Sequence, residues 1–243
     1  MRWAAPALAL IACGGSPPPR SAPPPPPPPR PTRVMVETDS EAEPEDGMQV
    51  VAAHGHMEQA AVEAGLAPHT ADLMACYTSR VGRRRWLGGH VVLHWDIARD
   101  GTITKVLLSE SDLGAWPVEK CLLDVARGAT FDKPVGGDAD FQIPLDFSAK
   151  GAILAWDEDQ GEKAVGKQLA RLDACSKSEP PPDDVTVTAY VGPHGKVQSV
   201  GFSSGKSEIG DRWAECASKA VVAWKLPDPR GTIAKLAIRY RAR

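Results

Sequence analysis

Apolar and polar residues alternate in the same order in two separate stretches of this chain, residues 73–147 and 172–240. Each stretch has a helix-like segment with a cysteine, an alternating strand that ends at a glycine turn, and a further strand. A second cysteine-bearing helix, an exit with a proline and a last alternating strand follow. Alternation with a period of two predicts strands, and a spacing of three to four residues predicts helices. Each stretch therefore reads α-β-β-α-β.

The two stretches correspond position by position, which predicts an internal duplication. The alternating positions of the first strand are Val91, Leu93, Trp95 and Ile97 in one copy, and Val185, Val187, Ala189 and Val191 in the other. The matched pairs after it are Ile103 and Val197, Val106 and Val200, Cys121 and Cys216, Pro134 and Pro229, and Leu145 and Ile238. These shared positions are core and cysteine positions. Neither copy repeats a catalytic set, so the pattern favours a binding or structural protein over an enzyme.

The predicted fold class is α+β, with one unit over residues 48–149 and a divergent one over 150–243. Each unit would be a small antiparallel sheet with helices on one face. The helix that opens the second copy is predicted around Glu162–Cys175, where apolar residues recur at helical spacing. Units of about 80 residues are marginally stable alone. A disulfide in each, and docking of one copy on the other, would offset this.

The first residues have the features of an export signal. A positive Met1-Arg2 start precedes a short apolar run. Together they predict a signal peptide over residues 1–12. The run is shorter than the about 20 residues that a spanning helix needs. Leu10-Ile11-Ala12-Cys13 resembles a bacterial lipobox, and this implies cleavage before Cys13 and lipidation of that residue. Gly14 follows where an Asp would favour inner-membrane retention, so the outer membrane is expected. The alternative is an ordinary signal peptide with an incidental cysteine.

Residues 13–47 are predicted to be a disordered linker. Its first part contains an unbroken proline run over 23–29, and its last part is acidic. Proline-rich segments adopt an extended form of about 3.1 Å per residue. A spacer that lifts the folded part off the membrane is the expected role, and an SH3-type ligand is the alternative.

Four cysteines remain once Cys13 is set aside, and four cysteines permit three pairings. The duplication selects Cys76–Cys121 and Cys175–Cys216, one bridge inside each copy. Export would place the chain where disulfides persist. A four-cysteine metal site is the competing interpretation, but no closely spaced C-x-x-C pair is present.

Composition and motifs indicate little chemistry. The net charge of −3 gives no basic field for nucleic acid. The chain has no P-loop, no G-x-G-x-x-G after a strand and no H-E-x-x-H. His54 and His56 have no carboxylate or thiol partner at useful spacing. We therefore expect no catalytic residue, no metal, no cofactor and no nucleic-acid partner, with the lipid as the link to the membrane.

A basic cluster and two tryptophans are the candidate partner contacts. Arg83, Arg84 and Arg85 directly precede Trp86, and Trp116 lies in a later loop. The arginines would contact lipid head groups, an acidic partner or the acidic linker. The alternatives are a solvated loop for the arginines and core filling for both tryptophans.

The residues of the first copy resemble a known family. The matching residues, in chain order, are Leu73-x-x-Cys76-Tyr77, residues 89–97, Gly101-x-Ile103, Ser109, Val118-x-x-Cys121-Leu122, Phe131 and Pro134. Together they resemble the AgmX/PglI C-terminal domain, a disulfide-bearing relative of the TonB C-terminal domain found in envelope and gliding-motility proteins of myxobacteria. The resemblance covers about residues 65–148, and residues 160–243 more weakly. It implies a fold and a mode of contact, not a reaction.

Two functions follow. The first is a non-enzymatic, periplasm-facing lipoprotein that binds another envelope protein through an exposed sheet edge, with Phe141–Phe147 as the candidate edge. Pro144 would interrupt hydrogen bonding on one side of it. The second is a structural spacer or peptidoglycan-associated element, in which the copies cover each other's edges.

Overall fold

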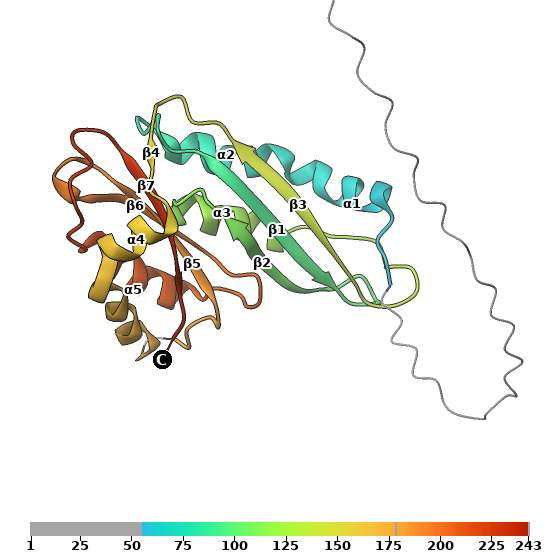
Figure 1. Ribbon diagram of the computed structural model, residues 1–243. Helices are drawn as coiled ribbons and strands as arrows, with labels where there is room; N and C mark the ends of the chain where they lie inside the picture. The colour runs from blue at the N-terminus through green and yellow to red at the C-terminus, as the bar shows by residue number, and fades with distance from the viewer. Residues whose placement is uncertain (1–54, 178, 243) are drawn as a thin grey trace, which may run out of the picture. The chain divides into compact units, whose positions relative to one another are not determined.

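The computed structural model describes residues 55–177 and 179–242 (Figure 1). The predicted signal peptide, Cys13, the linker over 13–47, and His54 lie outside the described residues. The structure is α+β, with two small sheets, helices packed on them and two disulfides. None of the helices in the described part of the chain combines the length and apolar character needed to cross a membrane.

The first repeat, residues 55–149, has a sheet in the order β2-β1-β3 with both pairs antiparallel. In chain order its elements are α1 (Gln59–Leu66), the 3₁₀ turn η1 (Ala67–His69), α2 (Thr70–Val81), β1 (Gly89–Ile97), β2 (Ile103–Ser111), α3 (Trp116–Arg127) and β3 (Ala139–Phe147). Figure 1 shows β3 on the outer side of this sheet, next to β1.

Alternation along β1 explains how the first sheet packs. Its odd-numbered residues from Val91 to Ile97 are at most 1% exposed and face the helices. His90, His94 and Asp96 lie on the opposite face, called here the outer face, and are partly exposed. Trp95 anchors the sheet to α3, because its indole N–H donates to the carbonyl of Ala126 (3.1 Å). The alternation predicted from the sequence is thus the burial pattern of the strand except at Val92, which lies on the outer face but is only 8% exposed.

The second repeat, residues 150–242, has the same connectivity around β5. In chain order its elements are β4 (Leu154–Ala155), α4 (Glu158–Val165), the 3₁₀ helix η2 (Gly166–Lys177), β5 (Val185–Val191), the turn η3 (Pro193–Gly195), β6 (Val197–Ser203), α5 (Asp211–Val222) and β7 (Ala234–Tyr240). The sheet order is β4-β7-β5-β6. The short β4 runs parallel to β7, so this sheet is not wholly antiparallel as expected.

The helix expected around Glu162–Cys175 is interrupted at Gly166. The α-helix α4 ends at Val165, and Gly166 follows with φ of 51° in the left-handed region. Glycine adopts this conformation readily, so it ends the helix and redirects the chain. The segment with Cys175 then continues as η2.

Helices cover one face of the first sheet, but both faces of the second sheet are covered. Thr188 and Tyr190 are fully buried although they point away from the helices of their own repeat. The Tyr190 hydroxyl donates to the carbonyl of Gly88 (2.7 Å), and the Thr188 hydroxyl donates to that of Ser111 (3.3 Å). Loops of the first repeat therefore lie on the outer face of the second sheet. Polar side chains tolerate burial there because each finds a backbone partner.

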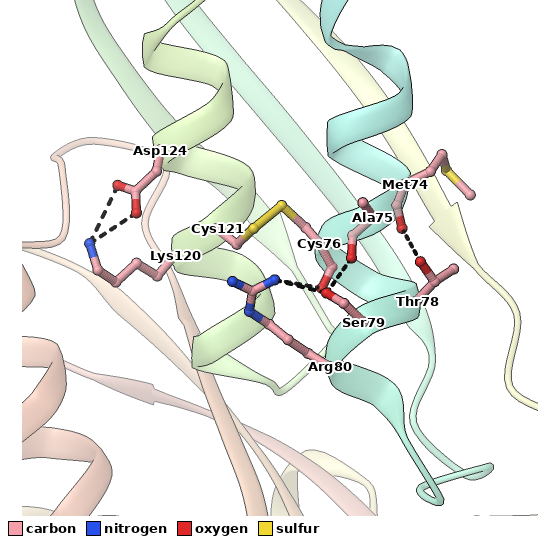
Figure 2. Close-up of a disulfide and its surroundings, with 9 residues drawn as sticks. All are labelled: Met74, Ala75, Cys76, Thr78, Ser79, Arg80, Lys120, Cys121 and Asp124. Atoms are coloured by element: carbon pink, nitrogen blue, oxygen red, sulfur yellow. Dashed lines mark hydrogen bonds and ion pairs between the residues drawn. A yellow bond between two sulfur atoms is a disulfide. The ribbon is translucent and has the colours of Figure 1, made fainter.

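Each repeat has an internal disulfide, in the pairing that the duplication selects. Cys76 joins Cys121 and Cys175 joins Cys216, each pair with its Cα atoms 5.6 Å apart. Figure 2 shows the first bridge between α2 and α3. Each bridge fixes the two helical segments that cover the inner face of a sheet.

Candidate functional site

Two of the four sheet edges in the described residues face each other at the junction between the repeats. The N–H of Ser204, just after β6, donates to the carbonyl of Leu108 on β2 (2.9 Å). The N–H of Val106 on β2 donates to the Glu208 carboxylate (3.3 Å). Because these groups are occupied within the chain, β2 and β6 offer little to an incoming strand.

A buried carboxylate occupies a further backbone group of β6. Glu119 on α3 is 0% exposed, and its Oε2 accepts a hydrogen bond from the N–H of Phe202 (2.9 Å). Its Oε1 accepts from the Ser111 hydroxyl (2.7 Å) and from the N–H of Gly114 (3.2 Å). Burial raises the pKa of Glu119 to about 7, against the opposing effect of these donors. The carboxyl group therefore links a loop, a helix and the neighbouring repeat.

The edge at β7 is covered by its own repeat. The short strand β4 pairs with Ala234 and Lys235 at the start of β7. Helix α4 packs against the rest of the strand, with Gly161 next to Ile238 and Leu236. Three of the four edges are thus at least partly occupied by other parts of the chain.

β3 is the remaining edge, and hydrogen bonds of β1 show which of its groups point outward. The carbonyls of His90, Val92 and Asp96 accept bonds from Asp112, Ser109 and Thr104, which all lie on or next to β2. In a strand, alternate residues bond to the same side. The odd-numbered residues of β1 therefore bond to β3, and they pair with the odd-numbered residues of β3. The even-numbered residues of β3 direct their backbone groups outward.

The open part of this edge is bounded at both ends. The carbonyl of Asp138 accepts from the N–H of Gly55 (2.8 Å). The carbonyl of Ser148 lies 3.4 Å from the Tyr77 hydroxyl, whose hydrogen makes a shorter bond to the carbonyl of Leu87 (2.8 Å). Between these ends, no hydrogen bond from the described residues reaches the outward backbone groups. The outward residues are Asp140, Gln142, Pro144 and Asp146. They offer four carbonyls and three N–H groups, since proline has none.

Side chains of β3 give its two faces different character. Phe141, Ile143 and Leu145 lie on the helix side and are only partly buried. Phe141 stacks on Trp95 with ring centroids 5.0 Å apart, which fixes this end of the apolar row. The outward residues alternate with them and are exposed on the outer face. A strand added here would meet apolar surface on one side and carboxylates on the other.

The predicted contact residues lie elsewhere. Arg83, Arg84 and Arg85 are exposed in the turn after α2, and their guanidinium groups form no ion pair with the described residues. Trp86 packs on Tyr190 of the second repeat (4.8 Å between centroids). Trp116 is 5% exposed and packs edge-on against Phe202 (5.8 Å). Both tryptophans are thus in the junction between the repeats and not beside β3.

Sequence reasoning missed Glu119, although the pattern contained a signal for it. Glu119, Leu122, Leu123 and Ala126 occupy one buried stripe of α3. An acid at such a position requires hydrogen-bond partners from another element. The equivalent position of the second repeat is Ala214, so the duplication hides this feature.

Comparison with known proteins returned no match to any family model, to any curated protein or to any solved structure. Among the described residues, no group of three or more His, Cys, Asp or Glu side chains is arranged to hold a metal ion. The open edge at β3 is therefore the candidate site.

Proposed function

We propose that this chain is a non-enzymatic lipoprotein of the cell envelope that binds another envelope protein by accepting one of its segments as an added strand on β3. The observation that carries the proposal is the unequal treatment of the sheet edges. The edges of β2 and β6 meet at the junction and are partly occupied there, and β4 pairs with the start of β7, whereas β3 presents four consecutive outward residues with no backbone partner among the described residues. Unpaired edges of this kind are templates for strand addition.

The anchoring part of the proposal rests on the sequence. Cys13 would carry the lipid, and the proline-rich linker would hold the folded repeats on the periplasmic side of the outer membrane. Two disulfides agree with an exported chain, because disulfides persist in oxidising compartments. The tandem TonB C-terminal-like assignment also belongs to this proposal. The shared connectivity of the two repeats supports it.

A structural spacer is the second candidate, and the junction favours it in part. The repeats do close two of their edges against each other, as a purely structural protein would require. Strand addition needs β3 to remain accessible in the cell, whereas the spacer does not. The two functions therefore differ in whether β3 contacts another protein.

Site-specific photo-cross-linking in intact cells separates them. A photoreactive amino acid replaces Gln142 on the open edge and, in a matched control, Val222, which is 53% exposed on α5. Strand addition predicts cross-links from position 142 to one short segment of a single envelope protein, and none to that segment from 222. Mass spectrometry of the linked peptides identifies the segment.

A backbone variant tests whether the contact is strand pairing. Gln142→Pro removes an outward N–H, so a cross-linker at position 140 should lose its product in this variant and keep it in Gln142→Thr. Equal cross-linking in both variants would exclude strand pairing at β3. Cross-links from 140 and 142 only within the chain or to peptidoglycan would leave the spacer function.

A further inference from the structure

An acidic recess lies at the beginning of the open edge. It has a volume of about 260 Å³. Its polar lining residues are Asp96, Thr104, Asp138 and Asp140, and its apolar ones are Ile97, Ala98 and Ala139. Asp138 and Asp140 are spaced two residues apart, so their side chains point to the same outer face. The recess is therefore next to the position where an added strand would begin or end.

The chain balances the charge of the recess only in part. Asp96 and Asp140 are directly opposite each other in the β1–β3 register, an arrangement that repels. His94 Nε2 contacts Asp96 Oδ1 (2.7 Å), and the backbone N–H of Arg99 donates to Asp138 Oδ1 (2.9 Å). The cationic groups are farther away: Lys105 lies 3.6 Å from Asp96, and the Arg99 guanidinium lies 3.8 Å from Asp138. Both distances exceed that of a direct hydrogen bond. Asp140 has no ion pair with any described residue, so the recess has room and charge for one more cation.

The other end of the edge differs. Asp146 is 81% exposed, and its Oδ1 already contacts Nδ1 of His90 (2.9 Å). A basic side chain would therefore gain less beside Asp146 than in the recess.

We propose that the strand bound by β3 carries a lysine or arginine that enters this recess, followed at alternate positions by apolar residues that pack along Phe141, Ile143 and Leu145. This inference rests on the proposed function and specifies its partner. An exposed carboxylate row next to a half-buried apolar row is complementary to a strand that alternates basic or polar with apolar residues. A second copy of β3 is a poor occupant, because its own aspartates would face Asp140 and Asp146.

Synthetic peptides provide the probes. Three fluorescent seven-residue peptides alternate threonine and valine, so that the threonines face the outward residues of β3. One has lysine in place of the first threonine, one has lysine in place of the last, and one has neither. Binding to the full chain is measured by fluorescence anisotropy. One lysine peptide, set by strand direction, should bind about fivefold more tightly than the neutral peptide, since a favourable ion pair contributes up to about 1 kcal/mol.

Two variants on the same strand form a matched pair. Asp140→Asn should abolish the advantage of that lysine peptide and leave the neutral peptide unchanged. Asp146→Asn, on the same face of β3 but outside the recess, should preserve the advantage. The advantage should also shrink as salt rises toward 1 M, because exposed charges are screened.

N-methylation of the peptide backbone separates the two proposals. Methyl groups on one alternate set of nitrogens should abolish binding, and methyl groups on the other set should not, because only one set faces β3. If the peptides obey this rule but all three bind equally, the basic anchor is wrong and strand addition stands. If none binds, or if methylation at both sets is tolerated, both proposals are wrong.

Discussion

The carboxylate of Glu119 on α3 accepts a hydrogen bond from the backbone N–H of Phe202 on β6, 2.9 Å away in the other repeat. The side chain is fully buried, and it also binds the Ser111 hydroxyl and the loop that leads into α3. The carboxyl group of Glu119 is therefore subject to two opposing effects on its pKa, burial and hydrogen bonding. Burial disfavours the charged form, while each N–H donor favours it.

The first prediction is that ionisation of Glu119 weakens the folded state as pH rises. The pKa of this group is raised from 4.5 to about 7 in the folded chain, so the folded chain binds its proton more tightly than the unfolded chain. The resulting stabilisation is complete below about pH 4.5 and is lost as pH rises through 7. Urea unfolding between pH 5 and 8 should show the wild type losing up to about 3 kcal/mol relative to Glu119→Gln.

Wild type and Glu119→Gln are compared by how their free energies of unfolding change with pH, and not by their values at one pH. Glutamine places an N–H₂ group where every neighbour donates, so Glu119→Gln is expected to have a constant offset at all pH values. The exposed Glu215→Gln on α5 is the control and should follow the wild type. Parallel pH profiles of wild type and Glu119→Gln would show that the carboxyl group does not titrate in this range.

A second prediction concerns the close approach of Gly201 to Glu119. A Cβ atom at Gly201 would collide with both carboxylate oxygens. Gly201→Ala should therefore lower the free energy of unfolding by about 1–3 kcal/mol, the usual effect of overpacking a buried site. Gly205→Ala is the control, because its Cβ would lie an ordinary 3.6 Å from the carbonyl of Ser109. An equal effect of the two substitutions would contradict the collision.

Local patterns were sufficient to predict much of each repeat. Alternation toward a glycine turn placed the strands, and the buried odd-numbered residues from Val91 to Ile97 follow it. Matched helix positions placed Cys121 and Cys216, and the duplication then selected both disulfides. The candidate edge over Phe141–Phe147 could be proposed because a three-stranded sheet has two edge strands, and the order β2-β1-β3 makes β3 one of them. These features depend on residues close in sequence, or on the comparison of two copies.

The junction could not be predicted in this way. Tyr190 and Thr188 read as outward residues, and only the loops of the other repeat explain their burial. For Trp86 and Trp116 the sequence favoured core filling only slightly over partner contact, since it does not say which loop faces a second sheet. The break at Gly166 was missed because the apolar spacing continues past it, while the backbone does not. The acidic recess also needed the β1–β3 register, which brings Asp96 opposite Asp140.

A third prediction compares the two disulfides. Their sequence separations are 45 and 41 residues, so the loop-entropy model gives each about 4 kcal/mol. Replacement of either pair by alanines, which suit the buried sites of Cys76 and Cys175, should lower the free energy of unfolding by similar amounts. Urea unfolding of the two double variants checks this. A difference above about 2 kcal/mol would mean that residual structure or strain, and not loop length, decides the contribution.

A final prediction tests the orientation of β3 itself, independently of any partner. The backbone of Ile143 bonds to β1. The N–H of Gln142 points outward, and so does the backbone nitrogen of Pro144, which carries no hydrogen. Gln142→Pro should therefore change the free energy of unfolding by less than about 1 kcal/mol, and Ile143→Pro should reduce it by about 3 kcal/mol or more. Gln142→Ala and Ile143→Ala control for the lost side chains, and the proline effect is the difference from alanine at each site.

A larger proline effect at Gln142 than at Ile143 would reverse the assignment of outward groups. The open edge would then consist of the odd-numbered residues of β3, with Pro144 bonded inward. The present assignment instead explains why the strand tolerates a natural proline at 144: the missing N–H lies on the side where no strand of the described chain requires it.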